Sequence, residues 1–290
     1  MQELLRSWLQ VTAAEQVAWP DPTSVYGRLF SQQTPLTGFA FEPECLNQAL
    51  LDAVVIALAW PRARIGPDVT PWCPLTSLLA ARADPNCACA EQPGASCIGP
   101  LPWLCLVPAG RGGATPLHRL ALAREERPQE GKVCAVAALL LRSGADPNRR
   151  DTEGGGMTPL HWACHSGMLA RRPPRPPLIE LLLAGRADAG ARTAQGYGAL
   201  QLSLPHAAEA GLALLSSATG ALDPAALTEA AALARHYLRP GCAFTGEEAA
   251  DDASLLRAQP TPKLQLQRLE AQLSAAIAAS ELCLSQRIFR

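Results

Sequence analysis

The residues best suited to catalysis are a thiol and two imidazoles that lie close together in the sequence: His161, Cys164 and His165. A thiolate beside an imidazole is the arrangement of a cysteine nucleophile and its base. Cys164 and His165 are adjacent, however, and adjacent residues on a helix point about 100° apart, so their side chains do not face each other. No acidic residue is placed to orient either ring. We therefore expect no catalytic site and no enzyme activity.

A second group of candidate residues consists of five cysteines in one irregular stretch: Cys73, Cys87, Cys89, Cys97 and Cys105. Thiolates are common ligands of structural zinc. The wide gaps and the single Cys-x-Cys differ from the paired Cys-x-x-Cys of common zinc modules. We expect scattered, partly buried thiols with no metal and no cofactor; the alternative is a zinc site that includes Cys73, Cys87, Cys89 and Cys97.

A third candidate is a proline-rich docking sequence at residues 171–177, Arg-Arg-Pro-Pro-Arg-Pro-Pro. Arg171, Pro174 and Pro177 fit the basic-x-x-Pro-x-x-Pro order that Src-homology-3-type domains bind. Prolines hold the polyproline II shape in advance, so binding loses little entropy. The alternative interpretation is a stiff loop that separates two helices.

All three candidates lie in or beside an internal repeat. Thr-Pro-Leu-His occurs at 115–118 and again at 158–161, and each copy leads to a leucine run, at 139–141 and 181–183, that is followed by Gly-Ala-Asp or Arg-Ala-Asp. The threonine can cap a helix and the proline suits the first helical position. We expect the histidines His118 and His161 to hold neighbouring backbone by hydrogen bonds, which is a structural role.

This pattern resembles the ankyrin repeat, a unit of about 33 residues with two helices. The two copies begin 43 positions apart, and most of the excess lies between the helices of each unit, at 124–131 and 169–177. Insertions in such loops leave the stacking faces intact. The resemblance implies an all-α, ankyrin-type helical solenoid with enlarged inter-helix loops.

Weaker units flank the two clear ones. Residues 198–201 occupy the motif position without Thr, Pro or His, and 208–217 is the expected second helix. Upstream, 78–86 is the closing half of a unit whose first helix is predicted at 44–60. Helices predicted at 2–19, 225–238 and 263–283 would cap the ends. The expected organisation is an extension at 1–43, a repeat domain at 44–222 with a Cys/Pro-rich insertion at 87–112, and a helical cap at 223–290.

Composition favours a scaffold over a nucleic-acid or membrane binder. The chain has 290 residues, 25 basic and 26 acidic, with a net charge of −1. A nucleic-acid or membrane-surface protein would need a basic patch or stripe, so we expect neither partner. The most apolar run, 53–60, is too short to cross a bilayer. Ten cysteines without a recognisable secretory signal predict reduced thiols and a cytoplasmic or nuclear protein.

The resemblance also implies a protein partner, bound on a concave face formed by hairpin tips and the first helix of each unit. By position, that face comprises Arg119, Arg149, Arg150, Asp151, Met157, Trp162, His165, Arg192, Gln195 and Tyr197. Trp, Tyr and Arg dominate interface energetics, which favours Trp162, Tyr197 and Arg150 as anchors that the stack itself does not need. The alternative for Trp162 is a packing role between adjacent first helices.

The C-terminal region suggests a second function. Leu282-Cys283 is similar to the suppressor-of-cytokine-signalling box that follows ankyrin repeats in some ubiquitin-ligase adaptors. Arginine does not follow this cysteine, and no Leu-Pro-Leu-Pro element comes later. The alternative function is therefore a substrate adaptor of a ubiquitin ligase, and the alternative structural role of 263–283 is a dimer contact instead of a cap.

Overall fold

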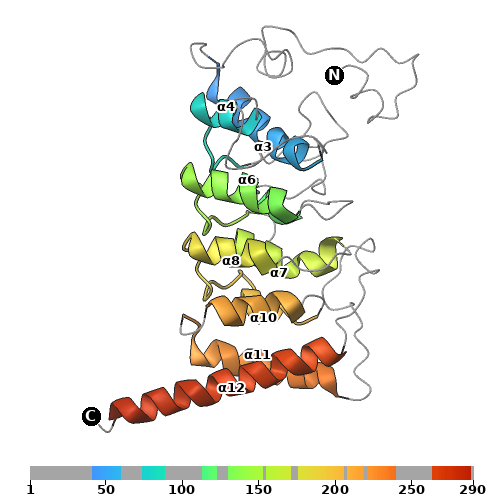
Figure 1. The fold of residues 1–290 in the computed structure, drawn as a ribbon, viewed down its shortest axis with the longest axis vertical. Coiled ribbons are helices and arrows are strands. Elements are labelled where there is room, and N and C mark those ends of the chain that lie inside the picture. Colours follow the sequence, from blue (N-terminus) through green and yellow to red (C-terminus); the bar gives the residue numbers. More distant parts are fainter. Residues whose placement is uncertain are drawn as a thin grey trace, which may run out of the picture.

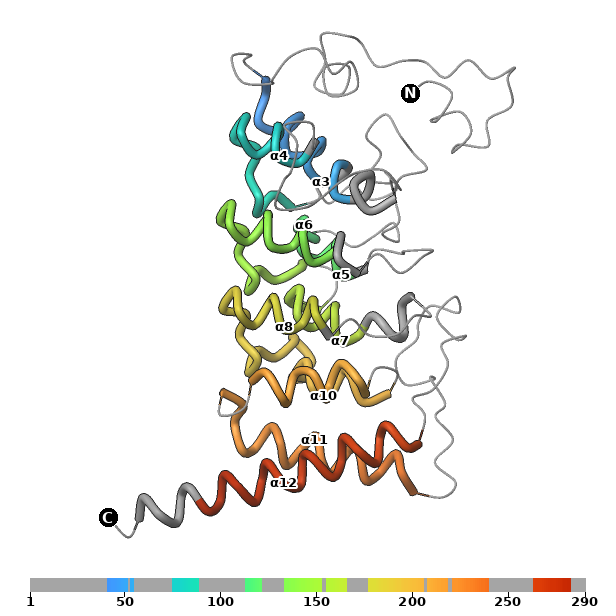
Figure 2. The backbone as a smooth tube through the Cα atoms, viewed as in Figure 1, coloured from blue at the N-terminus to red at the C-terminus, as the bar shows by residue number. Residues whose placement is uncertain are grey.

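The helices of the chain stack in pairs along one elongated column (Figure 1). The structure is a computed structural model that describes residues 41–59, 74–88, 113–122, 130–152, 155–170, 176–205, 208–218, 221–239 and 263–288. The pairs follow one another in chain order from α3 and α4 at one end to α11 and α12 at the other (Figure 2). No helix in these ranges is both long enough and apolar enough to span a membrane.

Each pair has a first and a second helix. The first helices are α3 (Pro43–Ala59), α5 (Pro116–Leu122), α7 (Pro159–Ala170), α9 (Ala199–Ser203) and α11 (Pro224–Leu238), and the second helices are α4 (Pro74–Ala80), α6 (Glu130–Arg142), α8 (Pro176–Ala184), α10 (Ala208–Ser217) and α12 (Lys263–Ile288). First helices pack on first helices throughout, and second helices pack on second helices from α6 to α12. The described part has no strand beyond a single bridge between Arg192 and Gly198. The predicted all-α solenoid is confirmed.

The predicted helices of the later units match the structure closely. Helix α10 has the predicted bounds, and α11 begins at Pro224 behind an Asp223 cap, whose Oδ1 accepts the Ala225 amide at 3.2 Å. Helix α9 has only five residues, and Gly198 provides no hydroxyl cap. The Gln201 side chain accepts the Gly198 amide instead, at 2.7 Å. The helix predicted at 2–19 and most of the 87–112 insertion lie outside the described residues.

The C-terminal helices form a further pair of the stack. Helix α11 contacts α9, and α12 contacts both α10 and α11, as the helices of another repeat would. Gly211 allows this approach: a Cβ there would lie 2.6 Å from Ser203 Oγ and 2.9 Å from a Leu269 methyl. Helix α12 starts at the predicted Lys263 but runs past the predicted end at 283 to Ile288.

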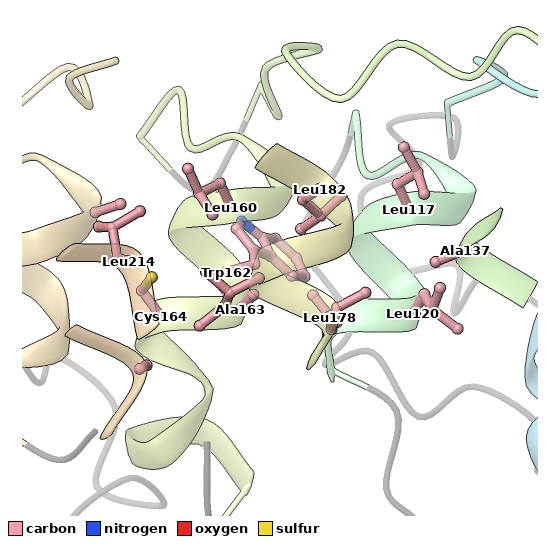
Figure 3. Packing of buried hydrophobic residues seen from close by; sticks show 14 of the residues in the cluster. Leu117, Leu120, Ala137, Leu160, Trp162, Ala163, Cys164, Leu178, Leu182 and Leu214 are labelled. Atoms are coloured by element: carbon pink, nitrogen blue, oxygen red, sulfur yellow. The ribbon is translucent and has the colours of Figure 1, made fainter. Parts of the chain in front are cut away.

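One hydrophobic core runs through the stack. Figure 3 shows part of it as a row of buried side chains from Leu117 and Leu120 on α5, through Trp162 on α7, to Leu214 on α10. Leucines of the second helices, including Leu178 and Leu182, complete each layer. Because every helix pair is buried by its neighbours, the repeats present only their loops and outer helix faces to solvent.

Candidate functional site

Each Thr-Pro-Leu-His motif fixes the start of a first helix. The hydroxyl of Thr115 lies 2.8 Å from Nδ1 of His118, and Thr158 and His161 repeat this distance. The backbone amides of both threonines donate to the same Nδ1 atoms at 3.2 Å. Because Nδ1 accepts these bonds, the ring proton of each histidine resides on Nε2.

The other ring nitrogen of each histidine reaches the next hairpin. Nε2 of His118 donates to the Met157 carbonyl at 3.0 Å, and Nε2 of His161 donates to the Ala191 carbonyl at 3.1 Å. Burial lowers the pKa of His118 to about 4 and also lowers the pKa of His161. Both rings are therefore neutral at pH 7 and join successive repeats, so the predicted structural role is confirmed.

Two asparagines, which no sequence-based expectation included, join the turns after the second helices. The side-chain amide of Asn86 donates to the Gly144 carbonyl at 2.9 Å, and its Oδ1 accepts the Asp146 amide at 2.6 Å. Asn148 makes the same two contacts one unit further on, with Arg186 and Asp188, at 3.0 and 2.7 Å. The recurring Asp-Pro-Asn sequence is the feature from which these contacts could have been predicted.

Trp162 is buried in the core, so its predicted role as a partner-binding anchor is wrong. Its side chain has no exposed surface, and its Nε1 donates to Asp151 Oδ2 at 2.7 Å. The indole meets the ring of His118 edge-on, with centroids 5.2 Å apart. Asp151 Oδ1 accepts the Met157 amide at 2.8 Å. The alternative interpretation, packing between adjacent first helices α5 and α7, is the one the structure supports.

Three other predicted binding residues are also turned toward the stack. Arg119 occupies the position equivalent to Trp162 and is 3% exposed, so it cannot meet a partner at the surface. Met157 is half-buried and packs against the core, and its carbonyl is bound by His118. His165 is half-buried on α7. The face of each first helix just after the histidine therefore serves repeat packing.

Two exposed arginines at equivalent positions hold the hairpins that precede α7 and α9. Arg150 Nη1 donates to the carbonyls of Gly156, at 3.0 Å, and Arg192, at 2.6 Å. Arg192 Nη1 donates to the Gly196 carbonyl and to Glu229 Oε2, both at 3.0 Å. Arg150 was expected to have no structural task, and that expectation is wrong because its side chain connects two hairpins.

The remaining hairpin residues are open to solvent. Arg149 and Gln195 are exposed, and Tyr197 is 51% exposed, which is unusual for a large apolar side chain. We call Arg149, Arg150, Arg192, Gln195 and Tyr197 together the hairpin surface. The Ala194 amide donates to the Gly155 carbonyl at 2.6 Å, so the two hairpins that carry this surface are joined directly.

The proline-rich docking sequence is interrupted by a helix. Pro176 and Pro177 are the first two residues of α8, so Pro177 has helical backbone and cannot belong to a polyproline II ligand. Proline is favoured at such positions because the first helical amides need no acceptor. Arg171 and Pro174 lie outside the described residues.

Of the thiols that the structure describes, Cys87 and Cys164 are buried. Burial raises the pKa of Cys164 to about 12, and burial and the nearby Asp84 raise the pKa of Cys87 to about 12. Cys87 Sγ donates to the Asn47 carbonyl at 3.5 Å. Within the described ranges, no three His, Cys, Asp or Glu side chains are grouped to hold a metal ion. Cys73, Cys89, Cys97 and Cys105 lie outside those ranges.

Comparison with known families agrees with the fold. The ankyrin-repeat family model matches residues 112–152 and 155–194, which contain α5 with α6 and α7 with α8. A search of curated protein sequences gave no match to the chain. The chain therefore contains ankyrin repeats at these residues. Ankyrin repeats are in general protein–protein interaction modules, so a protein partner is the class of ligand that the fold indicates.

Proposed function

We propose that the chain is a non-catalytic scaffold that binds a protein partner on the hairpin surface. The observation that carries the proposal is Tyr197, a large side chain left 51% exposed on a hairpin that several backbone hydrogen bonds hold in place. Tyrosine and arginine are among the residues that contribute most to binding energy at interfaces. Tyr197, Arg150 and Arg192 would be the principal contacts.

The rigidity of the hairpins supports this role. The Thr193 amide donates to the Tyr197 carbonyl at 2.9 Å, and the Tyr197 amide donates back to Thr193 Oγ1 at 3.2 Å. Arg192 spans the same turn through the Gly196 carbonyl. A surface whose backbone is already fixed loses little entropy when a partner binds, and that loss is a main limit on affinity.

The polar groups of the core also support a role as a scaffold without catalytic activity. Both ring nitrogens of His118 and of His161 form hydrogen bonds within the stack. The raised pKa of Cys164 keeps its thiol protonated at pH 7, and a thiol is a far weaker nucleophile than a thiolate. None of these groups is offered to a substrate. The C-terminal Leu282 and Cys283 lie in α12, and the adaptor role suggested for that region stays a prediction.

The test compares two exposed apolar residues in one capture experiment. Immobilised full-length chain would capture partners from lysate, and each protein identified would be purified and its affinity measured for wild type, Tyr197→Ala and Leu264→Ala. Leu264 is 60% exposed on α12 and serves as the matched control. We expect Tyr197→Ala to weaken binding by at least about fivefold, since an interface tyrosine contributes 1 kcal/mol or more. Weakening by Leu264→Ala alone would place the partner on α12 and contradict the proposal.

A further inference from the structure

Among the described residues, Arg150 and Arg192 each form hydrogen bonds through one guanidinium nitrogen, Nη1. Both hydrogens of Arg150 Nη1 go to backbone carbonyls, those of Gly156 and Arg192. Both hydrogens of Arg192 Nη1 go to Gly196 and Glu229. In the described part of the chain, neither Nε nor Nη2 of either residue forms a hydrogen bond or an ion pair. Both side chains are exposed, and the bonds through Nη1 leave the Nε–Nη2 edge of each arginine available for a ligand.

That edge has the geometry that binds a carboxylate. The guanidinium carries its five donors in a planar, fixed fork, and two parallel N–H groups fit the two oxygens of one carboxylate. Such pairs are favourable when the arginine is already held in place, because less rotamer freedom is then lost. In Arg150 and Arg192 the bonds through Nη1 provide this restraint before any ligand arrives.

We propose that the hairpin surface recognises an acidic segment of its partner, with carboxylates bound side-on by Arg150 and Arg192. The proposal rests on the proposed function and adds the chemistry of the ligand. Arg149, which is exposed and makes no ion pair among the described residues, adds positive charge next to Arg150.

The repeat geometry sets the spacing of the acidic residues. Arg150 and Arg192 occupy equivalent positions in adjacent units, and packed helices lie about 8–10 Å apart. A polyproline II segment advances about 3.1 Å per residue and returns to the same face every third residue. Two acidic residues three positions apart in such a segment would therefore reach both arginines. Tyr197 follows Gly196, whose carbonyl holds Arg192, and its exposed ring would be available to a neighbouring apolar residue of the ligand.

Glu229 allows a test of whether the ligand is negatively charged. Its Oε2 accepts from Arg192 Nη1 at 3.0 Å and from Gln201 Nε2 at 3.2 Å, so a negative charge already lies beside the second site. This charge repels an acidic ligand. Glu229→Gln keeps a side-chain oxygen for these two donors and removes the charge, so it should strengthen binding. A surface that recognises basic or neutral partners would show the opposite sign or no change.

The experiment pans a phage-displayed library of random peptides on the full-length wild-type chain, then measures selected peptides by fluorescence polarisation. We expect peptides with two acidic residues three positions apart, and weaker affinity as salt is raised. Arg150→Gln should weaken binding about tenfold, because a bidentate charged contact is lost. Arg150→Lys should restore only part of the loss, since lysine keeps the charge without the fork.

The controls separate recognition from folding. Thermal melts of each variant identify any loss that arises from the hairpin bonds of Arg150. Glu229→Gln should tighten binding about threefold as repulsion is removed. Arg235→Gln, which alters an arginine paired with Glu270 at 3.4 Å across α11 and α12, should leave peptide affinity unchanged.

Each other outcome overturns a defined part of the account. Selected peptides that lack acidic residues but lose affinity with Tyr197→Ala would leave the binding face correct and the acidic ligand wrong. Acidic peptides whose affinity falls with Glu229→Gln, or is unchanged by Arg150→Gln, would also refute the carboxylate sites. If none of the selected peptides depends on the hairpin surface for binding, both proposals are contradicted. A random RNA oligonucleotide that binds more tightly than every peptide, and in an Arg150-dependent way, would assign these edges to phosphate instead.

Discussion

The Trp162 indole donates its Nε1 hydrogen to Asp151 Oδ2 at 2.7 Å, joining a core side chain of α7 to the hairpin that precedes the same helix. The other carboxylate oxygen accepts the Met157 amide at 2.8 Å, and Met157 in turn receives the hydrogen bond from His118. Asp151 is itself only 3% exposed. The hairpin surface is thus built directly on the packed core, and changes in one should affect the other.

We expect Asp151→Ala to lower the free energy of unfolding by about 2–3 kcal/mol, because it leaves a buried indole N–H and the Met157 amide without their acceptor. Asp188→Ala is the control: Asp188 is exposed and bonds the Gly190 amide at 2.9 Å, so the loss should stay below about 1 kcal/mol. Urea denaturation followed by circular dichroism measures both. Equal losses would show that the bond to Trp162 contributes little.

The buried histidines predict a loss of stability in acid. The pKa of His118 is about 4 in the fold and about 6.5 in the unfolded chain, so the unfolded state binds more protons at intermediate pH. Above pH 6.5 the protonation of His118 does not reduce the free energy of unfolding. As the pH falls from 6.5 to 4, this free energy decreases by up to about 3 kcal/mol.

His161, whose pKa is also lowered, adds a loss of the same sign. Unfolding free energies measured across this pH range should fall steeply for wild type and less steeply for His118→Gln. His236→Gln, which changes an exposed residue on α11, should keep the wild-type slope. If the free energy of unfolding of the wild type does not change between pH 6.5 and 4, the two histidines are not buried and neutral as described.

Gly211→Ala should destabilise the C-terminal pair. In an open helical position this change stabilises by about 1 kcal/mol, because alanine favours the helix. At Gly211 the added methyl would meet Ser203 Oγ at 2.6 Å and Leu269 at 2.9 Å, so α12 must move away from α10. We expect a lower melting temperature and easier proteolysis between α11 and α12. A rise in melting temperature would mean that α12 does not pack on α10 as described.

Two arginines stand where glycine would be more stable. Arg82 and Arg186 have φ values of 68° and 69°, and the equivalent residue in the unit between them is Gly144, with φ 91°. A left-handed backbone disfavours residues with a side chain by about 1 kcal/mol. Arg82→Gly and Arg186→Gly should each raise the unfolding free energy by about 0.5–1 kcal/mol.

Gly144→Ala supplies the reciprocal control for these arginines. In the described part of the chain, no atom beyond the glycine and its two chain neighbours lies within 4 Å of a Cβ built on Gly144, so the substitution introduces backbone strain without a clash. It should destabilise by about 1 kcal/mol in the same denaturation assay. If the left-handed backbone is the cause, the arginine-to-glycine changes must raise the free energy of unfolding and Gly144→Ala must lower it.

The sequence predicted the helices well because capping and turn residues are local signals. Asp223-Pro224 marked the start of α11, and leucines spaced three and four apart marked α12. The site was predicted less well. Tyr197 is exposed as expected, whereas Trp162 is buried because a hairpin aspartate satisfies its indole, a pairing that depends on the tertiary fold. The bonds from Arg150 to backbone carbonyls have no sequence signature at all.

The central claim is that a protein partner binds the hairpin surface, and hydrogen–deuterium exchange of the full-length chain with and without a purified partner tests it most directly. We predict slower exchange on binding in the hairpins at 149–157 and 192–198, with α12 unchanged. Protection confined to α11 and α12, with both hairpins exchanging as in the free chain, would contradict the account.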